Sequence, residues 1–248
     1  MTPSPLRVER SGPVWRLTLD RPAQGNACSA ELVAALDEAL QQAEREAAQA
    51  VVLQGAGRHF CTGFDLSGLA QESDDTLLAR FVRIELMLQR LARAPFLTVA
   101  VAQGRCIGAG ADLFTACERR LVGAEASFAF PGARGFGLVL GTRRLCDAVG
   151  PTRALGWIES GALVGVDEAL HSGLASERLA QDGDAMAQVH ALLPEDGALR
   201  GALRRAARPH REHEDAADLR HLVESAARAG LRERIQAYVE RSAARRRG

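Results

Sequence analysis

A strand followed by a helix is predicted near the start of the chain. Apolar and polar residues alternate over positions 14–19, and this stretch stops at a turn signal that includes Pro22, which is typical of a half-buried strand. Ser29 is a suitable N-cap, and leucines recur every four positions after it. A helix is therefore predicted from Ser29 to about Arg45.

The same alternation continues further along the chain. Residues 50–54 form a short apolar run that ends at Gly55, which predicts a buried strand. A helical pattern over residues 75–93 is closed by Pro95, and residues 96–102 predict the next strand. Strands that alternate with helices in this way predict an α/β fold with a mostly parallel sheet covered by helices.

The chain changes character at Pro194. From there to the C-terminus it is rich in arginine and alanine, carries a helical pattern and shows little strand signal. We therefore predict a core over residues 1–193 and a helical C-terminal region over residues 194–248. Its arginines are expected on solvated helix faces, with docking to a partner subunit or an anionic cofactor as the alternative.

Composition and charge limit the classes of partner. The 248 residues are 47% apolar and 25% charged, and 31 basic residues balance 31 acidic ones, so no net positive field attracts nucleic acid or an anionic membrane. Every basic residue is arginine, which excludes Schiff-base chemistry and a lysine base. The chain has no long apolar span and no leader-like N-terminus, and its five cysteines are scattered. We expect a cytoplasmic protein with no membrane span, metal site or disulfide framework.

Two loops that contain glycines carry the candidate chemistry. They occupy residues 57–66 and 103–113, and each follows an apolar predicted strand. Glycine lets the backbone approach a ligand closely, and a helix that begins near Gly110 presents unpaired N–H groups. Two such groups can hold one carbonyl oxygen as it becomes an oxyanion. Close packing of helix on strand is the structural alternative, and the second loop lacks the spacing of a dinucleotide fingerprint.

Several segments, in the same order and spacing, resemble the crotonase superfamily, also called the enoyl-CoA hydratase/isomerase family. The similarity extends over roughly residues 8–180. The resemblance implies a spiral of ββα units, a helical C-terminal region that packs in trimers, and an acyl-CoA thioester ligand. Coenzyme A would then be part of the substrate rather than a separate cofactor, and the assembly would be a homotrimer or a hexamer. The matching segments are Leu17–Pro22 with Asn26 and Ala27, Val51–Leu69, Val99–Cys117, Ser127–Pro131, Gly141–Gly150 and Ser160–Gly173.

The resemblance also assigns roles to residues in both loops. The oxyanion donors would be the backbone N–H groups of Phe64 and Ala109, and Ala109 stands where the family usually has glycine. Asp65 is expected to order its loop by accepting backbone N–H bonds. The substrate-binding residues, including those near an adenine pocket, would be Phe60, Cys61, Thr62, Gly63, Asp65, Leu66, Gly108, Gly132 and Leu138.

Most positions that carry an acidic residue in this family carry a non-acidic residue in this chain. Hydratases of the family use two glutamates; the first position matches Asp112 and the second matches Gly132. A third acidic position, used by some isomerases, matches Leu138, and residues 133–142 contain no acid. Asp112 would lie in the first turn of a helix, where the helix dipole favours its anion, so it is expected to act as a base. A simple capping role is the structural alternative.

These observations lead to one hypothesis with two rivals. The chain is expected to be an acyl-CoA enzyme that stabilises an enolate, isomerase-like, with Asp112 as its single proton carrier. A weak enoyl-CoA hydratase is the first rival, because a missing acid or base typically lowers a rate by about 10²–10⁴. A non-catalytic acyl-CoA-binding protein is the second, and Gly132 is the residue that favours it.

Overall fold

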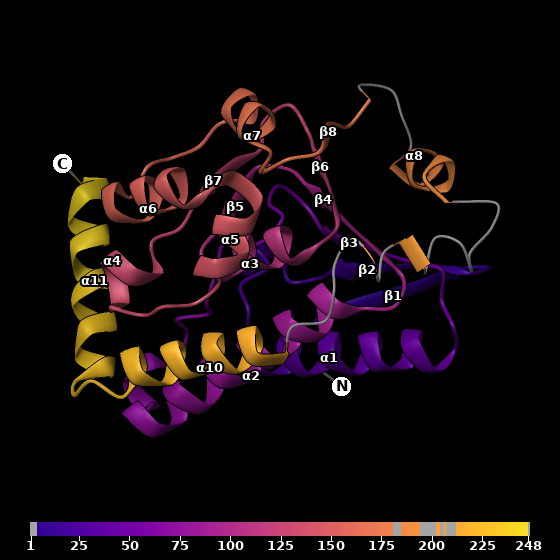
Figure 1. Ribbon diagram of the computed structural model, residues 1–248. Helices are drawn as coiled ribbons and strands as arrows, with labels where there is room; N and C mark the ends of the chain where they lie inside the picture. The colour runs from indigo at the N-terminus through magenta and orange to yellow at the C-terminus, as the bar shows by residue number, and fades with distance from the viewer. Residues whose placement is uncertain (1–3, 181–184, 194–201, 204–205, 207–211, 248) are drawn as a thin grey trace.

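Six strands form the main sheet in the described part of the chain (Figure 1). The computed structural model describes residues 4–180, 185–193, 202–203, 206 and 212–247. The strand order is β1-β2-β3-β4-β6-β8; β1 and β2 pair antiparallel, and every other pair is parallel. The strands are β1 Leu6–Ser11, β2 Val14–Leu19, β3 Ala50–Gly55, β4 Leu97–Ala102, β6 Arg119–Val122 and β8 Glu177–Arg178.

The first helices lie where the sequence predicts them. Helix α1 (Ala30–Arg45) begins after Ser29, whose hydroxyl accepts a bond from the Leu32 N–H at 3.2 Å. Helix α2 (Asp74–Arg93) begins after Ser73 with a capping box, so both starts have side-chain partners for their first N–H groups. The predicted strands at 14–19 and 50–54 are confirmed as β2 and β3.

The β4 and β6 strands are each followed by a short strand and a helix. Strand β5 (Arg105–Ile107) leads into α3 (Ala109–Ala116), and β7 (Ser127–Ala129) leads into α4 (Gly132–Phe136). β5 and β7 pair with each other in a separate two-stranded sheet. The ββα repeat implied by the family resemblance is therefore confirmed.

Helices α10 (Glu212–Ala226) and α11 (Leu231–Arg247) of the C-terminal part pack back on the core. Helix α10 lies along α2, and α11 stands beside α4 (Figure 1). The Asp74 carboxylate at the start of α2 caps α11 by accepting from the N–H groups of Gly230, Leu231 and Arg232 at 2.8–3.1 Å. The predicted boundary at Pro194 lies outside the described residues, and trimer formation stays a prediction. The remaining helices are η1 Pro22–Gln24, η2 Leu69–Gln71, α5 Thr142–Val149, α6 Pro151–Ser160, α7 Val166–Ser172 and α8 Ala185–Ala191.

Both faces of the sheet are buried. One face packs against α1, α2 and α3 in the larger apolar core, and the other is covered by Met186 and Val189 of α8. Burial on both faces explains why the central strands β3 and β4 are nearly continuous apolar runs. None of the helices within the described ranges has the length and apolar character needed to cross a bilayer.

Asn26 ties the turn after β2 to the loop after β3. The residue is fully buried and adopts a left-handed conformation with φ of 56°, which asparagine tolerates better than most residues. Its Nδ2 donates to the carbonyl oxygens of Ala56 at 2.9 Å and His59 at 2.7 Å. Its Oδ1 accepts from the Arg21 N–H at 2.9 Å. One amide therefore fixes the start of the first candidate loop.

We predict that Asn26→Ala destabilises the fold. The substitution leaves buried backbone groups without partners, and each such group typically costs about 1–3 kcal/mol. The urea midpoint should fall, whereas Gln24→Ala, at an exposed position in the same turn, should leave it unchanged. Equal midpoints for both variants would contradict this role.

Candidate active site

The two candidate loops lie against each other at one edge of the sheet. They follow the neighbouring parallel strands β3 and β4, whose carboxyl ends meet at the same edge. The Cys61 N–H donates to the Arg105 oxygen at 3.3 Å, and the Ile107 N–H donates to the Cys61 oxygen at 3.0 Å. A Cβ atom at Gly110 would lie only 2.3 Å from the Cys61 oxygen, so glycine is what allows α3 to approach the first loop.

The two residues predicted to supply the oxyanion N–H groups line one cavity. Phe64 and Ala109 both line it, and a Cβ atom built on Gly63 would lie 3.8 Å from the Ala109 nitrogen. Among the hydrogen bonds of the described residues, neither the Phe64 N–H nor the Ala109 N–H has an acceptor. This is an arrangement that can hold a carbonyl oxygen, and the oxyanion role of the two groups stays a prediction.

The cavity has a volume of about 100 Å³ and mostly apolar walls. Its lining contains six of the predicted substrate-binding residues: Thr62, Gly63, Leu66, Gly108, Gly132 and Leu138. Phe60, Cys61 and Asp65 are buried and lie outside this lining. An adenine pocket near those three residues stays a prediction.

Asp112 supplies the carboxyl group of the cavity. It lies in the first turn of α3 with only 6% of its surface exposed. Burial raises the pKa of its carboxyl to about 8, with Arg144 opposing the shift and Glu85 adding to it. At pH 7 a carboxyl with this pKa is mostly protonated. The expected role of Asp112 as a base stays a prediction. Within the described residues the carboxyl has no hydrogen-bond partner.

Gly141 is pressed against the Asp112 carboxyl. It has φ of 69°, and a Cβ atom there would lie 2.1 Å from Asp112 Oδ1. Any side chain at this position would displace the carboxyl or the start of α5. No local pattern in the sequence reports this contact of Gly141, because it depends on how α5 folds back onto α3.

Asp65 shapes the first loop from outside the cavity. Its Oδ1 accepts from the Ser67 N–H at 2.9 Å, and its Oδ2 lies 2.7 Å from Nη2 of Arg21. Burial alone would raise the pKa of Asp65, but the bonds from Ser67 and the Arg21 guanidinium together lower it. The expected ordering of this loop by Asp65 is confirmed by the bond from Ser67.

Aromatic residues from three helices complete the walls and were not predicted. Phe81 of α2, Phe136 of α4 and Tyr238 of α11 line the cavity. The Tyr238 ring meets Phe136 edge-on, with centroids 5.1 Å apart. Tyr238 is the single tyrosine of the chain, and it follows the buried Ile235 by about one helical turn. This spacing could have predicted that Tyr238 lies on the apolar face of α11.

Asp112 and Tyr238 are the ionisable side chains in this lining. No three histidine, cysteine, aspartate or glutamate side chains gather as a metal site in the part of the chain that the structure describes. The chemistry available at the cavity is therefore one buried carboxyl beside two unpaired N–H groups and one phenol.

A family model for enoyl-CoA hydratase/isomerase matches residues 9–246. The chain belongs to this family. A crystal structure from Bordetella parapertussis, named as an enoyl-CoA hydratase/isomerase, superposes with a TM-score of 0.86 at 44% sequence identity. The match covers 95% of this chain and 98% of that one, and it confirms the crotonase-type fold.

Other members of the family have more specific names. A Mycobacterium bovis protein named probable enoyl-CoA hydratase echA6 is 36% identical over 73% of each chain. A Danio rerio ethylmalonyl-CoA decarboxylase is 32% identical over 75% of this chain and 63% of its own length. An enoyl-CoA hydratase structure from Thermobifida fusca, in complex with acetoacetyl-CoA, has a TM-score of 0.73 at 27% identity and covers 88% of this chain and 92% of that one. The relatives thus carry the names of acyl-CoA enzymes.

We predict that removing the charge of Asp112 stabilises the fold, and does so more at high pH. The folded pKa of about 8 lies above the ordinary value of 3.8, so the unfolded chain releases this proton first as the pH rises. The wild-type protein therefore loses about 1.4 kcal/mol per pH unit between these values. In urea denaturation, the free energy of unfolding of Asp112→Asn should exceed that of wild type by more at pH 8 than at pH 5.

Asp65→Asn is the matched control, with the opposite sign. Because the folded pKa of Asp65 is lowered, its anion stabilises the fold above the unfolded pKa, and this contribution is lost only in acid. The Asp65 variant should be less stable than wild type at both pH values. A gap between wild type and Asp112→Asn that does not change with pH would contradict the buried, protonated carboxyl.

Proposed function

We propose that this protein is an acyl-CoA enzyme that forms a thioester enolate and moves the double bond of an enoyl-CoA, with Asp112 as its single proton carrier. The observation that carries the proposal is one buried carboxyl in a cavity shared with two unpaired N–H groups. The Thermobifida fusca relative in complex with acetoacetyl-CoA supports a CoA thioester as the ligand.

The thioester oxygen accepts hydrogen bonds from the Phe64 and Ala109 N–H groups. In its ionised form, Asp112 takes the α-proton of a 3-enoyl thioester, and the C–H electron pair enters the conjugated dienolate, whose charge rests mainly on that oxygen. The same carboxyl then returns the proton to the γ-carbon, which leaves a 2-enoyl thioester and the Asp112 anion. Each oxyanion donor typically contributes about 2.7–4 kcal/mol to the transition state.

One proton carrier suits isomerisation better than hydration. Isomerisation removes and returns one proton, whereas adding water requires a group that activates the water and a group that protonates carbon. The second position is Gly132, which lines the cavity without a side chain. A weak hydratase therefore remains the close alternative, with a rate lowered by about 10²–10⁴.

Decarboxylation is a second candidate, favoured by the protonation state of Asp112. Loss of CO₂ from a malonyl-type thioester leaves the C–C electron pair as an enolate, which needs one proton at the α-carbon. Asp112 is mostly protonated at pH 7 and can donate that proton, then regain one from water. The relatives named ethylmalonyl-CoA decarboxylase make this reaction worth testing.

A panel of acyl-CoA and enoyl-CoA thioesters incubated in D₂O and analysed by mass spectrometry separates these reactions. We expect deuterium at the α- and γ-carbons of an enoyl thioester, because the protonated Asp112 carboxyl exchanges its proton with D₂O before returning it. This incorporation should fall at least 100-fold in Asp112→Asn, consistent with the loss of a positioned base. A ligand that binds tightly but neither exchanges hydrogen nor reacts would favour the non-catalytic alternative, and rapid water addition would favour the hydratase.

The pH dependence distinguishes the two proton roles. If the Asp112 anion acts as base, turnover should rise about tenfold per pH unit up to pH 8 and then level off, because the ionised fraction does so. If the protonated form acts as donor after decarboxylation, turnover should instead fall above pH 8. A flat profile from pH 6 to 9 would exclude both roles.

Gly141→Ala should abolish turnover without unfolding the protein. Its Cβ atom would occupy the space of Asp112 Oδ1, so the carboxyl must move away from the reacting carbon. Gly156→Ala is the control, because no atom lies within 4 Å of the added methyl group and φ is not left-handed there. Full activity in Gly141→Ala would rule out the placement of Asp112 described above.

A further inference from the structure

A buried ion pair joins the two helices that flank α3. Arg144 of α5 contacts Glu85 of α2 through two bonds, Nη2 to Oε2 at 2.5 Å and Nη1 to Oε1 at 3.0 Å. The exposed fractions of the two side chains are 6% and 1%. A buried pair of this kind is seldom more stabilising than apolar residues of the same size. Its presence therefore points to a role other than stability.

The pair is carried by the two helices that pack against α3, and it lies outside the cavity. Helix α3, which carries Asp112, packs against both α2 and α5. Arg144 follows Gly141, the residue in contact with the Asp112 carboxyl, by three positions at the start of α5. Neither Glu85 nor Arg144 lines the cavity, so neither is placed to touch the substrate. They can act on the reaction only through Asp112.

The C-terminal helix α10 holds the pair from its far side. Asp218 Oδ2 lies 3.5 Å from Nη1 of Arg144. The Gln89 amide donates to Glu85 Oε1 at 2.9 Å and to the Asp215 backbone oxygen at 3.0 Å. The pair is therefore fixed by side chains and backbone on α2, α5 and α10.

We propose that Glu85 and Arg144 are positioning residues that tune proton release at Asp112 with opposed charges, and that α10 holds them in place. The proposal rests on the proposed function of Asp112 as proton carrier. Arg144 attracts the Asp112 anion and Glu85 repels it, and the two effects partly cancel. Changing either charge alone should shift the proton affinity of Asp112 in a direction that the charge dictates.

The other groups around Asp112 do not titrate in the same range. Strand β5 carries the Cys106 thiol, and the residues before α1 carry the Cys28 thiol. The hydrogen bond with Cys61 and then burial raise the pKa of Cys28 well above its ordinary value, and burial does the same for the pKa of Cys106. Arg105 on β5 is exposed to solvent, and β4 carries no titratable residue. The Arg144 pKa is also raised: burial lowers it, but the bonds to Glu85 prevail, so its charge is constant.

The test measures how the pH midpoint of α-hydrogen exchange moves in charge variants. Glu85→Gln should lower the midpoint by about one pH unit, and Arg144→Gln should raise it by a similar amount, as expected for a nearby charge. The double variant, which keeps the interior neutral, should lie between the two single variants. It also covers the case in which a single variant fails to fold.

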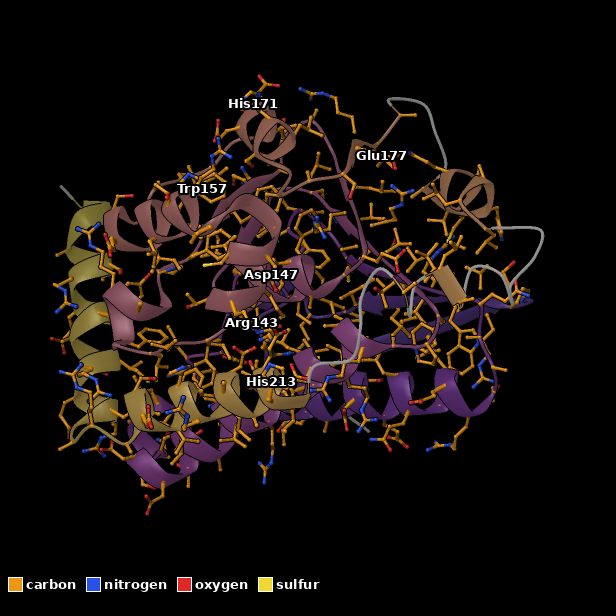
Figure 2. The ribbon with its side chains drawn as sticks, viewed as in Figure 1. Arg143, Asp147, Trp157, His171, Glu177 and His213 are labelled. Carbon is orange, nitrogen blue, oxygen red and sulfur yellow. The ribbon has the colours of Figure 1, made fainter. Side chains whose placement is uncertain are left out.

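Arg143→Gln is the matched control. Arg143 lies on the same turn as Arg144 and reaches toward α10 (Figure 2), where it pairs with Glu214, Asp215 and Asp218. It carries the same charge as Arg144 at the neighbouring position, but it is not among the charges that shift the pKa of Asp112. The midpoint should stay where it is in wild type. Equal shifts in Arg143→Gln and Arg144→Gln would overturn the proposal.

A second readout separates this proposal from the proposed function. The pH dependence of the stability gained by Asp112→Asn can be measured by urea denaturation in wild-type, Glu85→Gln and Arg143→Gln backgrounds, without any substrate. The gain should level off at a lower pH in the Glu85→Gln background only. If no thioester reacts but the gain levels off at a lower pH in the Glu85→Gln background, the effect of Glu85 on Asp112 is supported and the proposed function fails. If the stability gain levels off at the same pH in all three backgrounds, the proposal that Glu85 and Arg144 tune proton release at Asp112 is rejected.

Discussion

The burial of the Asp112 carboxyl is the constraint on which the rest of the site depends. Helix α3 begins at Ala109, with its unpaired N–H at the cavity, and places Asp112 within its first turn. The same short helix therefore fixes both a candidate oxyanion donor and the proposed proton carrier. Removal from water makes the carboxyl a weak acid, and it also makes the folded state less stable as the pH rises. The large apolar core offsets that loss.

Two close backbone contacts bring the separate parts of the site together. Gly110 lets α3 touch the loop after β3, and Gly141 lets the start of α5 touch the carboxyl. A side chain at either position would push these elements apart. The helices behind these contacts carry the Glu85–Arg144 pair, so the charge that faces Asp112 is set by the same packing that sets its geometry.

The sequence predicts much of this arrangement, and the omissions have physical reasons. The strands at β2 and β3 and the start of α1 at Ser29 follow from local patterns and are confirmed. Strand β1 was not predicted, because five of its six residues are exposed at the edge of the sheet and give no alternating apolar pattern. Gly141, Glu85 and Arg144 act on Asp112 only through long-range packing, which no local pattern reports. The raised pKa of Asp112 depends on burial by elements distant in the sequence, which its position in the first turn of a helix does not report.

A crystal structure of the protein with acetoacetyl-CoA would test the central claim most directly, because it shows where the thioester lies relative to Asp112. The account predicts a thioester oxygen at about 3 Å from both the Phe64 and Ala109 nitrogen atoms. The α-carbon should then face the Asp112 carboxyl, which Gly141 contacts. A thioester oxygen that contacts neither N–H group, or an α-carbon turned away from Asp112, would contradict it.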